Sequence, residues 1–155
     1  MKLQVKLDGF KDLEKALAEI GKRTTAKAVA RRALKKAAEP VAELASSLAP
    51  EGDTKTLRPS VAVGTKLSKR QARLHRKMFR NDKAAVEMFA GAGPLPSAHQ
   101  QEFGNENHAA QPFMRPAWDA EAMPTLDRLG NLMAAEIAAN AKRAAKRAAK
   151  AAKKG

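Results

Sequence analysis

Apolar and polar residues alternate with two different periods over the first third of the chain. Residues 2–7 place Leu or Val at every second position, which is typical of a half-buried strand. Over residues 10–20 the apolar positions recur at spacings of three and four, which predicts a short amphipathic helix ending at Gly21. The same spacing over residues 24–48 predicts a longer second helix. Pro40 should kink or divide that helix, because proline removes a backbone donor.

The middle of the chain predicts two strands on either side of a basic segment. Residues 57–64 fit an exposed or edge strand, since Pro59 cannot donate a hydrogen bond within a central one. Residues 84–90 predict a second strand, closed by a glycine- and proline-containing turn. Between them, residues 66–83 fit a short basic helix and equally a long loop.

The last third of the chain predicts one long helix that ends in a segment with few large side chains. Apolar residues recur at helical spacing from Pro116 to Ala139. Pro116 suits the first turn, and Pro124 should kink the helix or mark a restart. Beyond Ala139 the pattern continues only as Ala, Lys and Arg, which offer few large side chains for docking, so we expect a frayed end.

These elements predict an α+β fold: a small antiparallel β-sheet packed with two or three helices, followed by a long C-terminal helix with a basic Ala/Lys tail. We divide the chain into a single domain, residues 1–140, and the tail, residues 141–155. Large apolar side chains are sparse, with five Phe and one Trp among 155 residues. The core should therefore be small, and we expect partner subunits to complete the burial.

Charge is concentrated in two places. The net charge is +14, and the tail holds seven Lys or Arg and no acid. Residues 66–83 hold eight Lys or Arg and a single acid. Such blocks either attract polyanions or form a solvated surface. The candidate polyanion contacts are Lys69, Arg70, Arg73, Arg76, Lys77, Arg80, Lys142, Arg143, Lys146 and Arg147. Because aromatic residues are not interleaved with these cations, any DNA contact should be made by charge and be insensitive to sequence.

Few residues or motifs of the sequence could support catalysis or metal binding. With no cysteine there are no disulfides or thiolate metal sites, and no apolar run approaches the ~20 residues of a membrane span. No nucleophile motif or phosphate loop is present, so we predict neither an enzyme nor a cofactor. His99, Glu102 and His108 could form a metal set, although the turn-like residues between Glu102 and His108 fix no geometry.

The most specific segment lies between residues 97 and 117. It reads Glu102-Phe103-Gly104, a short polar loop, and then Pro112-Phe113-Met114-Arg115-Pro116-Ala117. This pattern resembles the lambdoid tailed-phage tail-component family, whose members are called neck or tail-completion proteins. Looser similarity extends over residues 3–120.

The resemblance implies a virion protein of the head–tail junction, made in the host cytoplasm. It would assemble as a ring of identical subunits that joins the tail to the head connector while the double-stranded genome passes through. The implied partners are further copies of the chain, head-connector or head-closure proteins, and tail-terminator or tail-tube proteins, with non-specific contact to genomic DNA. The alternatives are a tail terminator capping the tail tube, a sequence-independent basic DNA-binding protein, and a small metalloenzyme.

The residues of this segment also have a physical interpretation of their own. Glu102 could accept hydrogen bonds from backbone groups or pair with Arg115, and Gly104 permits a turn with positive φ. Phe113 and Trp118 are large anchors that suit either a domain core or a subunit interface. The candidate assembly residues are Glu102, Phe103, Gly104, Pro112, Phe113, Arg115, Pro116 and Trp118.

Overall fold

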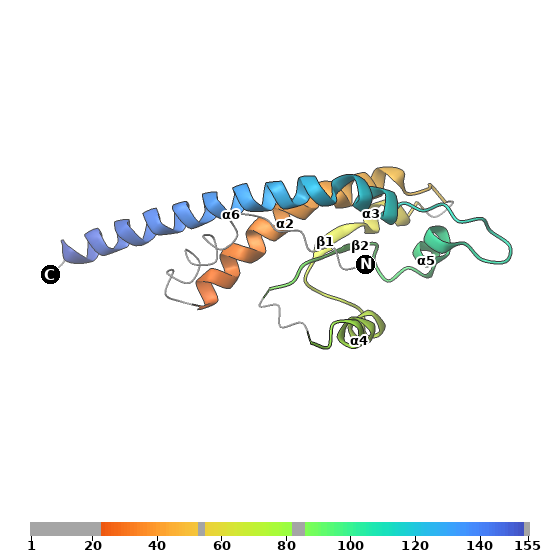
Figure 1. The fold of residues 1–155 in the computed structure, drawn as a ribbon, viewed down its shortest axis with the longest axis horizontal. Helices are drawn as coiled ribbons and strands as arrows, with labels where there is room; N and C mark the ends of the chain where they lie inside the picture. The colour runs from red at the N-terminus through yellow and green to blue at the C-terminus, as the bar shows by residue number, and fades with distance from the viewer. Residues whose placement is uncertain (1–22, 53–54, 82–85, 154–155) are drawn as a thin grey trace.

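The computed structural model describes residues 23–52, 55–81 and 86–153. Two helices dominate this part of the chain: α2 (Arg23–Leu48) and α6 (Met114–Ala152) lie side by side along the long axis of the molecule (Figure 1). The α+β fold class is confirmed, since both strands of a small antiparallel sheet contact α2. The strand predicted over residues 2–7 and the helix predicted over residues 10–20 lie outside the described residues.

Small side chains line the buried face of α2. Every fourth residue along this face is buried: Val29, Ala33, Ala37, Val41, Ala45 and Ala49. Because Ala and Val project little from the backbone, a neighbouring helix can approach closely along this line. An ion pair between Arg32 and Glu136, 3.0 Å from Nη2 to Oε2, links the outer edges of α2 and α6.

Both long helices continue through their prolines. Pro40 lies inside α2 and Pro124 inside α6, so neither divides its helix. The expectation of a frayed end after Ala139 is wrong for the described residues, since α6 continues to Ala152. Alanine has the highest helix propensity, and Lys150 in the last turn complements the helix dipole. The predicted boundary at residue 140 falls inside α6 and stays a prediction.

The strands described in the middle of the chain are shorter than predicted. They are β1 (Ala62–Gly64) and β2 (Phe89–Gly91), and they pair antiparallel, with Val63 opposite Ala90. The first half of the strand predicted over residues 57–64 is instead a helical turn, α3 (Leu57–Ser60). Proline is tolerated in the first turn of a helix, where its missing donor would have no partner, and Pro59 takes this place.

The main core lies where the C-terminal end of α2 meets the start of α6. Its buried members are Ala45, Ala49, Leu57, Phe113 and Ala117. Partly buried side chains complete it. They come from α2, from α5 (Pro96–Phe103), from the start of α6 and from the segments between the elements: Leu44, Val61, Ala92, Leu95, Ala98 and Met114. The core therefore fixes the start of α6 against α5, which positions the segment singled out in the sequence.

The basic segment contains a helix, α4 (Lys69–Met78). Ser68 caps it: the Ser68 hydroxyl accepts from the Gln71 backbone N–H (3.3 Å), and the Gln71 side chain accepts from the Ser68 N–H (3.0 Å). This capping box selects the helix over the alternative loop. In Figure 1, α4 lies beyond the sheet, on the side away from α2 and α6. Within the described residues, no helix is long and apolar enough to cross a membrane.

Candidate functional site

The backbone N–H groups at the start of α6 need hydrogen-bond acceptors from outside the helix. The cap residue and the first three residues of any α-helix have no intrahelical partners for their N–H groups. Here those four positions are Phe113, Met114, Arg115 and Pro116. Proline has no N–H, so three donors remain, and the cap residue Phe113 has no side-chain acceptor to offer them.

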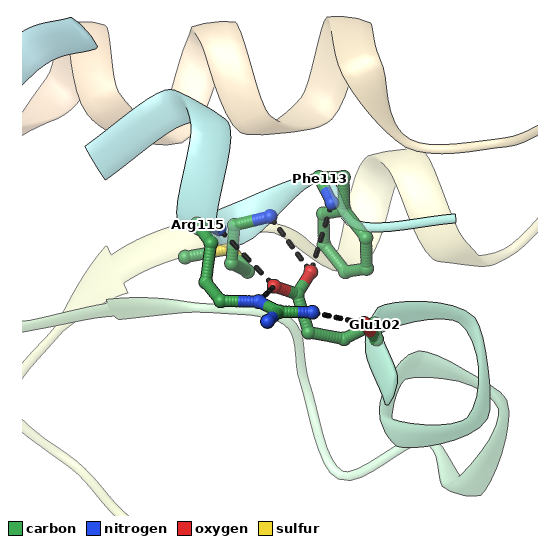
Figure 2. Close-up of polar contacts among 4 residues, drawn as sticks. Glu102, Phe113 and Arg115 are labelled. Carbon is green, nitrogen blue, oxygen red and sulfur yellow. Dashed lines mark hydrogen bonds and ion pairs between the residues drawn. The ribbon is translucent and has the colours of Figure 1, made fainter. Parts of the chain in front are cut away.

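One carboxylate from another helix accepts from all three donors (Figure 2). Oε2 of Glu102 accepts from the N–H groups of Phe113 (2.8 Å) and Met114 (2.9 Å), and Oε1 accepts from that of Arg115 (3.2 Å). Glu102 belongs to the last turn of α5, and only 6% of its surface is exposed. The negative charge also lies at the positive end of the α6 dipole, which is the favourable end for an anion.

The Arg115 side chain completes the arrangement, which we call the Glu102 clamp: Glu102, the N–H groups of residues 113–115 and the Arg115 guanidinium. Arg115 Nε donates to Oε1 of Glu102 (2.9 Å), and Nη2 donates to the Glu102 carbonyl oxygen (2.8 Å). Burial raises the pKa of Glu102, but the hydrogen bonds from Met114, Phe113 and Arg115 outweigh it, so the pKa lies below its ordinary value of 4.5. Glu102 is therefore an ionised structural group near neutral pH.

A glycine turn brings the two halves of the clamp together. Gly104 ends α5 with φ 75° and ψ 177°, a conformation that is essentially restricted to glycine. A Cβ at this position would lie 2.9 Å from the backbone N of Ala110, so the loop also needs the missing side chain for close approach. The positive φ expected for Gly104 is confirmed.

The loop between α5 and α6 is held to α5 by Gln101, a residue that no sequence pattern singles out. Its carbonyl oxygen accepts from the Gln111 N–H (2.7 Å), and its side-chain Oε1 lies 3.0 Å from Nε2 of His108. Across the loop, the Asn105 N–H donates to the His108 carbonyl oxygen (2.9 Å). With these bonds and the clamp, the whole segment from α5 to α6 is held in one arrangement.

The predicted assembly residues separate into buried and exposed groups. Phe113 is 1% exposed and belongs to the core, and Glu102 is buried in the clamp. Phe103 and Trp118 are 58% and 56% exposed, and Pro112, Arg115 and Pro116 are exposed as well. The Arg115 guanidinium lies 5.1 Å from the centre of the Phe103 ring. Arg115 therefore contacts both the buried carboxylate of Glu102 and the exposed ring of Phe103.

The proposed metal residues are directed to other contacts. Glu102 points into the start of α6, and the His99 ring packs against Phe103 with 4.8 Å between ring centres. His108 faces Gln101. In the described ranges there is no group of three His, Cys, Asp or Glu side chains placed to hold a metal ion.

The predicted cations form two separate groups. One set lies on α4 and the turn after it: Lys69, Arg70, Arg73, Arg76, Lys77 and Arg80, all exposed. The other set is exposed on the last turns of α6: Lys142, Arg143, Lys146 and Arg147. Figure 1 shows these turns of α6 extending away from the sheet, at a distance from α4. The structure does not bring the two groups together.

Comparison with known proteins gives one match. The family model of HK97-gp10-like bacteriophage tail components matches residues 11–104, which is more than half of the chain. The matched range includes Glu102, Phe103 and Gly104 and ends before the second half of the segment, residues 111–117. Neither a search of curated proteins nor one of solved structures gives a match.

Proposed function

The chain belongs to the HK97-gp10-like family of bacteriophage tail components, and from this we propose that it is a structural subunit of the phage head–tail junction. In this role it assembles as a ring, between a head-connector or head-closure protein on one side and a tail-terminator or tail-tube protein on the other. The ring joins the tail to the head and lets the double-stranded genome pass. Its mechanism is binding, and it needs no catalytic group.

The surface of the chain supports a role in an assembly. Among the described residues, seven large apolar side chains are exposed: Leu48, Leu74, Met78, Phe79, Phe103, Trp118 and Met123. In the same part of the chain, the largest fully buried side chains are Phe113, Val29 and Val41. Burial between subunits would supply the stabilisation that such a small core lacks.

The observation that carries the proposal is a group of exposed side chains beside the Glu102 clamp, which we call the clamp patch: Phe103, Arg115 and Trp118. Arg115 contacts the Phe103 ring, and Trp118 follows Arg115 by three residues in α6, so it lies on the same side of the helix. Trp and Arg are the residue types most enriched among side chains that dominate binding energy. Arg115 is held by the clamp, and the backbone of Phe103 is fixed between Glu102 and Gly104. A rigid patch loses little conformational entropy when a partner binds, which favours its use as an interface.

Assembly as a ring also explains how a small interface patch could hold the subunits together. Each subunit in a closed ring uses the same two surfaces, one toward each neighbour. A subunit that is held on both sides dissociates only when both contacts break, so moderate contacts give a durable ring. We propose that the clamp patch is one of these two surfaces.

The test compares self-association of the wild-type chain with that of Trp118→Ala and Phe103→Ala by sedimentation velocity over a range of concentrations. If these side chains anchor the interface, each substitution should weaken association by about 30-fold, which corresponds to about 2 kcal/mol. Thermal unfolding of the dilute protein should change little, because both side chains are exposed. Leu74→Ala on α4 is the control, since Leu74 is a large, similarly exposed apolar side chain far from the patch.

Two results would count against the proposal. One is a chain that stays monomeric at every concentration and does not join particles when supplied to a phage that lacks its gene. The other is equal association of the Trp118→Ala and Leu74→Ala proteins. Electron microscopy of particles made without the protein separates the junction from the terminator alternative. Filled heads and normal-length tails that fail to join support the junction, whereas tails of irregular length support a terminator.

A further inference from the structure

Helix α4 forms an arm with little attachment to the rest of the described chain. None of its residues is buried. His75 makes two contacts that join α4 to the body: its ring meets Phe89 of β2 edge-on at 5.2 Å, and its Nε2 lies 3.5 Å from Glu87. Ala72, on the same side of the helix as His75, is half-buried. This attachment turns the opposite side of α4 toward solvent.

One side of α4 carries cations around a common hollow. Arg73, Arg76, Lys77 and Arg80 line a shallow depression of about 470 Å³, and among the described residues they alone form its wall. Lys69 precedes them by one turn, and the described helix contains no acidic residue. Among the described residues these cations make no ion pair. Within the described residues, four positive groups therefore converge with no acidic partner.

This convergence opposes the stability of the helix. Lys69, Arg73 and Lys77 follow one another at four-residue spacing, and Arg76 lies three residues after Arg73. Like charges at these spacings repel and destabilise an isolated helix. A short helix without buried side chains gains little from packing to offset this repulsion. A polyanion in the hollow would remove the repulsion and stabilise the arm.

We propose that the α4 hollow binds the phosphate backbone of duplex DNA without regard to sequence. Arg and Lys are the side chains that hold phosphates, and four of them surround a depression that is open to solvent. Single-strand binding uses free aromatic rings for base stacking, whereas the Phe79 ring beside this face already packs on His75 at 4.8 Å. A helix that lies on a membrane needs a broad apolar face, whereas α4 has only 10 residues. The exposed apolar side chains of α4 and its cap are Leu74, Met78 and Phe79, and the Phe79 ring packs on His75.

The proposal fixes the expected salt dependence. A protein that neutralises Z phosphates of duplex DNA shows a slope of about −0.9Z in a plot of log K against log salt concentration. If the four cations of the hollow each neutralise one phosphate, they contribute about −3.6 to the slope. Between 50 and 200 mM salt, these contacts alone would lower the affinity by about 150-fold.

The experiment measures binding of the full chain to labelled duplexes of two unrelated sequences by fluorescence anisotropy over a series of salt concentrations. The test variant carries Arg73→Gln, Arg76→Gln, Lys77→Gln and Arg80→Gln. The control carries Lys142→Gln, Arg143→Gln, Lys146→Gln and Arg147→Gln, which removes the same charge from the exposed end of α6. We expect the test variant to lose about 3 to 4 units of slope for both sequences and the control to lose less than 1. Hydrogen exchange should show that duplex DNA protects the α4 amides of the wild-type chain.

Three results would overturn the assignment. Equal loss of slope in the two variants would mean that only net charge matters. Tighter binding of the hollow to polyglutamate than to duplex DNA would point to an acidic protein partner. Binding to anionic vesicles that depends on Leu74 and Met78, with no change in DNA affinity for the test variant, would point to a membrane surface.

The assignment does not depend on ring assembly. The test variant keeps the clamp patch and should associate like the wild type, and Trp118→Ala should bind DNA like the wild type. Failure of either proposal can therefore be recognised without the other.

Discussion

Replacing Glu102 by glutamine keeps the shape of the side chain and changes what it can accept. Oε2 takes the N–H groups of Phe113 and Met114, and Oε1 takes the N–H and Nε of Arg115. A glutamine amide has one oxygen and one NH2 group. In either orientation of the glutamine amide, two of the four N–H donors would face its NH2 group instead of an oxygen. The other two would donate to a neutral oxygen in place of a charged one.

The size of the effect follows from these contacts. Hydrogen bonds to a charged group contribute about 1.5–3 kcal/mol each, and a buried donor that loses its partner carries a desolvation cost. Loss of two such bonds should lower the free energy of unfolding by about 3 kcal/mol. That is a large fraction of the roughly 5–15 kcal/mol available to a domain, and for a chain of this size it lowers Tm by about 6–12 °C.

The assay is urea unfolding followed by far-UV circular dichroism, at a protein concentration where the chain does not associate. Glu106→Gln is the matched control, because Glu106 is an exposed glutamate in the loop between α5 and α6. It should change stability by less than about 0.5 kcal/mol. Equal stability of the Glu102→Gln and Glu106→Gln proteins would refute the argument that the carboxylate stabilises the start of α6.

The dependence on pH gives a second check on the same group. The pKa of Glu102 is lower in the folded chain than its ordinary value of 4.5. A depressed carboxyl pKa stabilises the fold above the unfolded pKa, and this stabilisation is lost as the pH falls through the folded pKa. The stability difference between the wild type and Glu102→Gln should therefore be constant near neutral pH and shrink below about pH 4.5. A difference that stays the same down to the lowest pH at which the protein folds would contradict this sign.

Two further predictions concern single positions around the clamp and along α6. Gly104→Ala should lower the free energy of unfolding by about 2 kcal/mol, because φ 75° with ψ 177° is strained for alanine and the Cβ would meet the Ala110 backbone. Gly130→Ala should raise it by up to about 1 kcal/mol, since Gly130 lies inside α6 and no atom of another described element lies within 4 Å of the added methyl group. Opposite signs in the same urea assay support the analysis, and equal signs contradict it. Phe113→Ala should cost about 3–5 kcal/mol by opening a cavity in the main core, and a calorimetric loss below 1 kcal/mol would show that Phe113 is not its anchor.

Local pattern predicted some elements well and others poorly. Helix α2 was predicted almost to its ends, because its apolar residues repeat every turn and Ala49-Pro50 stops it. The strand over residues 57–64 was wrong in its first half, since Pro59 fits a first helical turn as well as an edge strand. The end of α6 was predicted to fray because it lacks docking side chains, yet alanine propensity keeps it helical.

The candidate site was predicted in part. The sequence offered Glu102 two roles, as an acceptor for backbone N–H groups and as a partner of Arg115, and the structure shows both at once. Trp118 had two possible places, core and surface, and periodicity could not choose between them. The structure leaves Trp118 more than half exposed, while Phe113, five residues earlier, is fully buried.

The sequence by itself determined the features that depend on a residue and its near neighbours along the chain. These are the helical face of α2, the glycine needed at residue 104, the basic character of α4 and the absence of any thiol chemistry. Only the tertiary structure decided which donors meet Glu102, because they lie 11–13 residues away across a folded loop. It also decided which large side chains stay exposed, because exposure depends on what distant elements cover. Helix propensity and capping are local properties of the chain, whereas the clamp and the clamp patch exist only where α5 is packed against the start of α6.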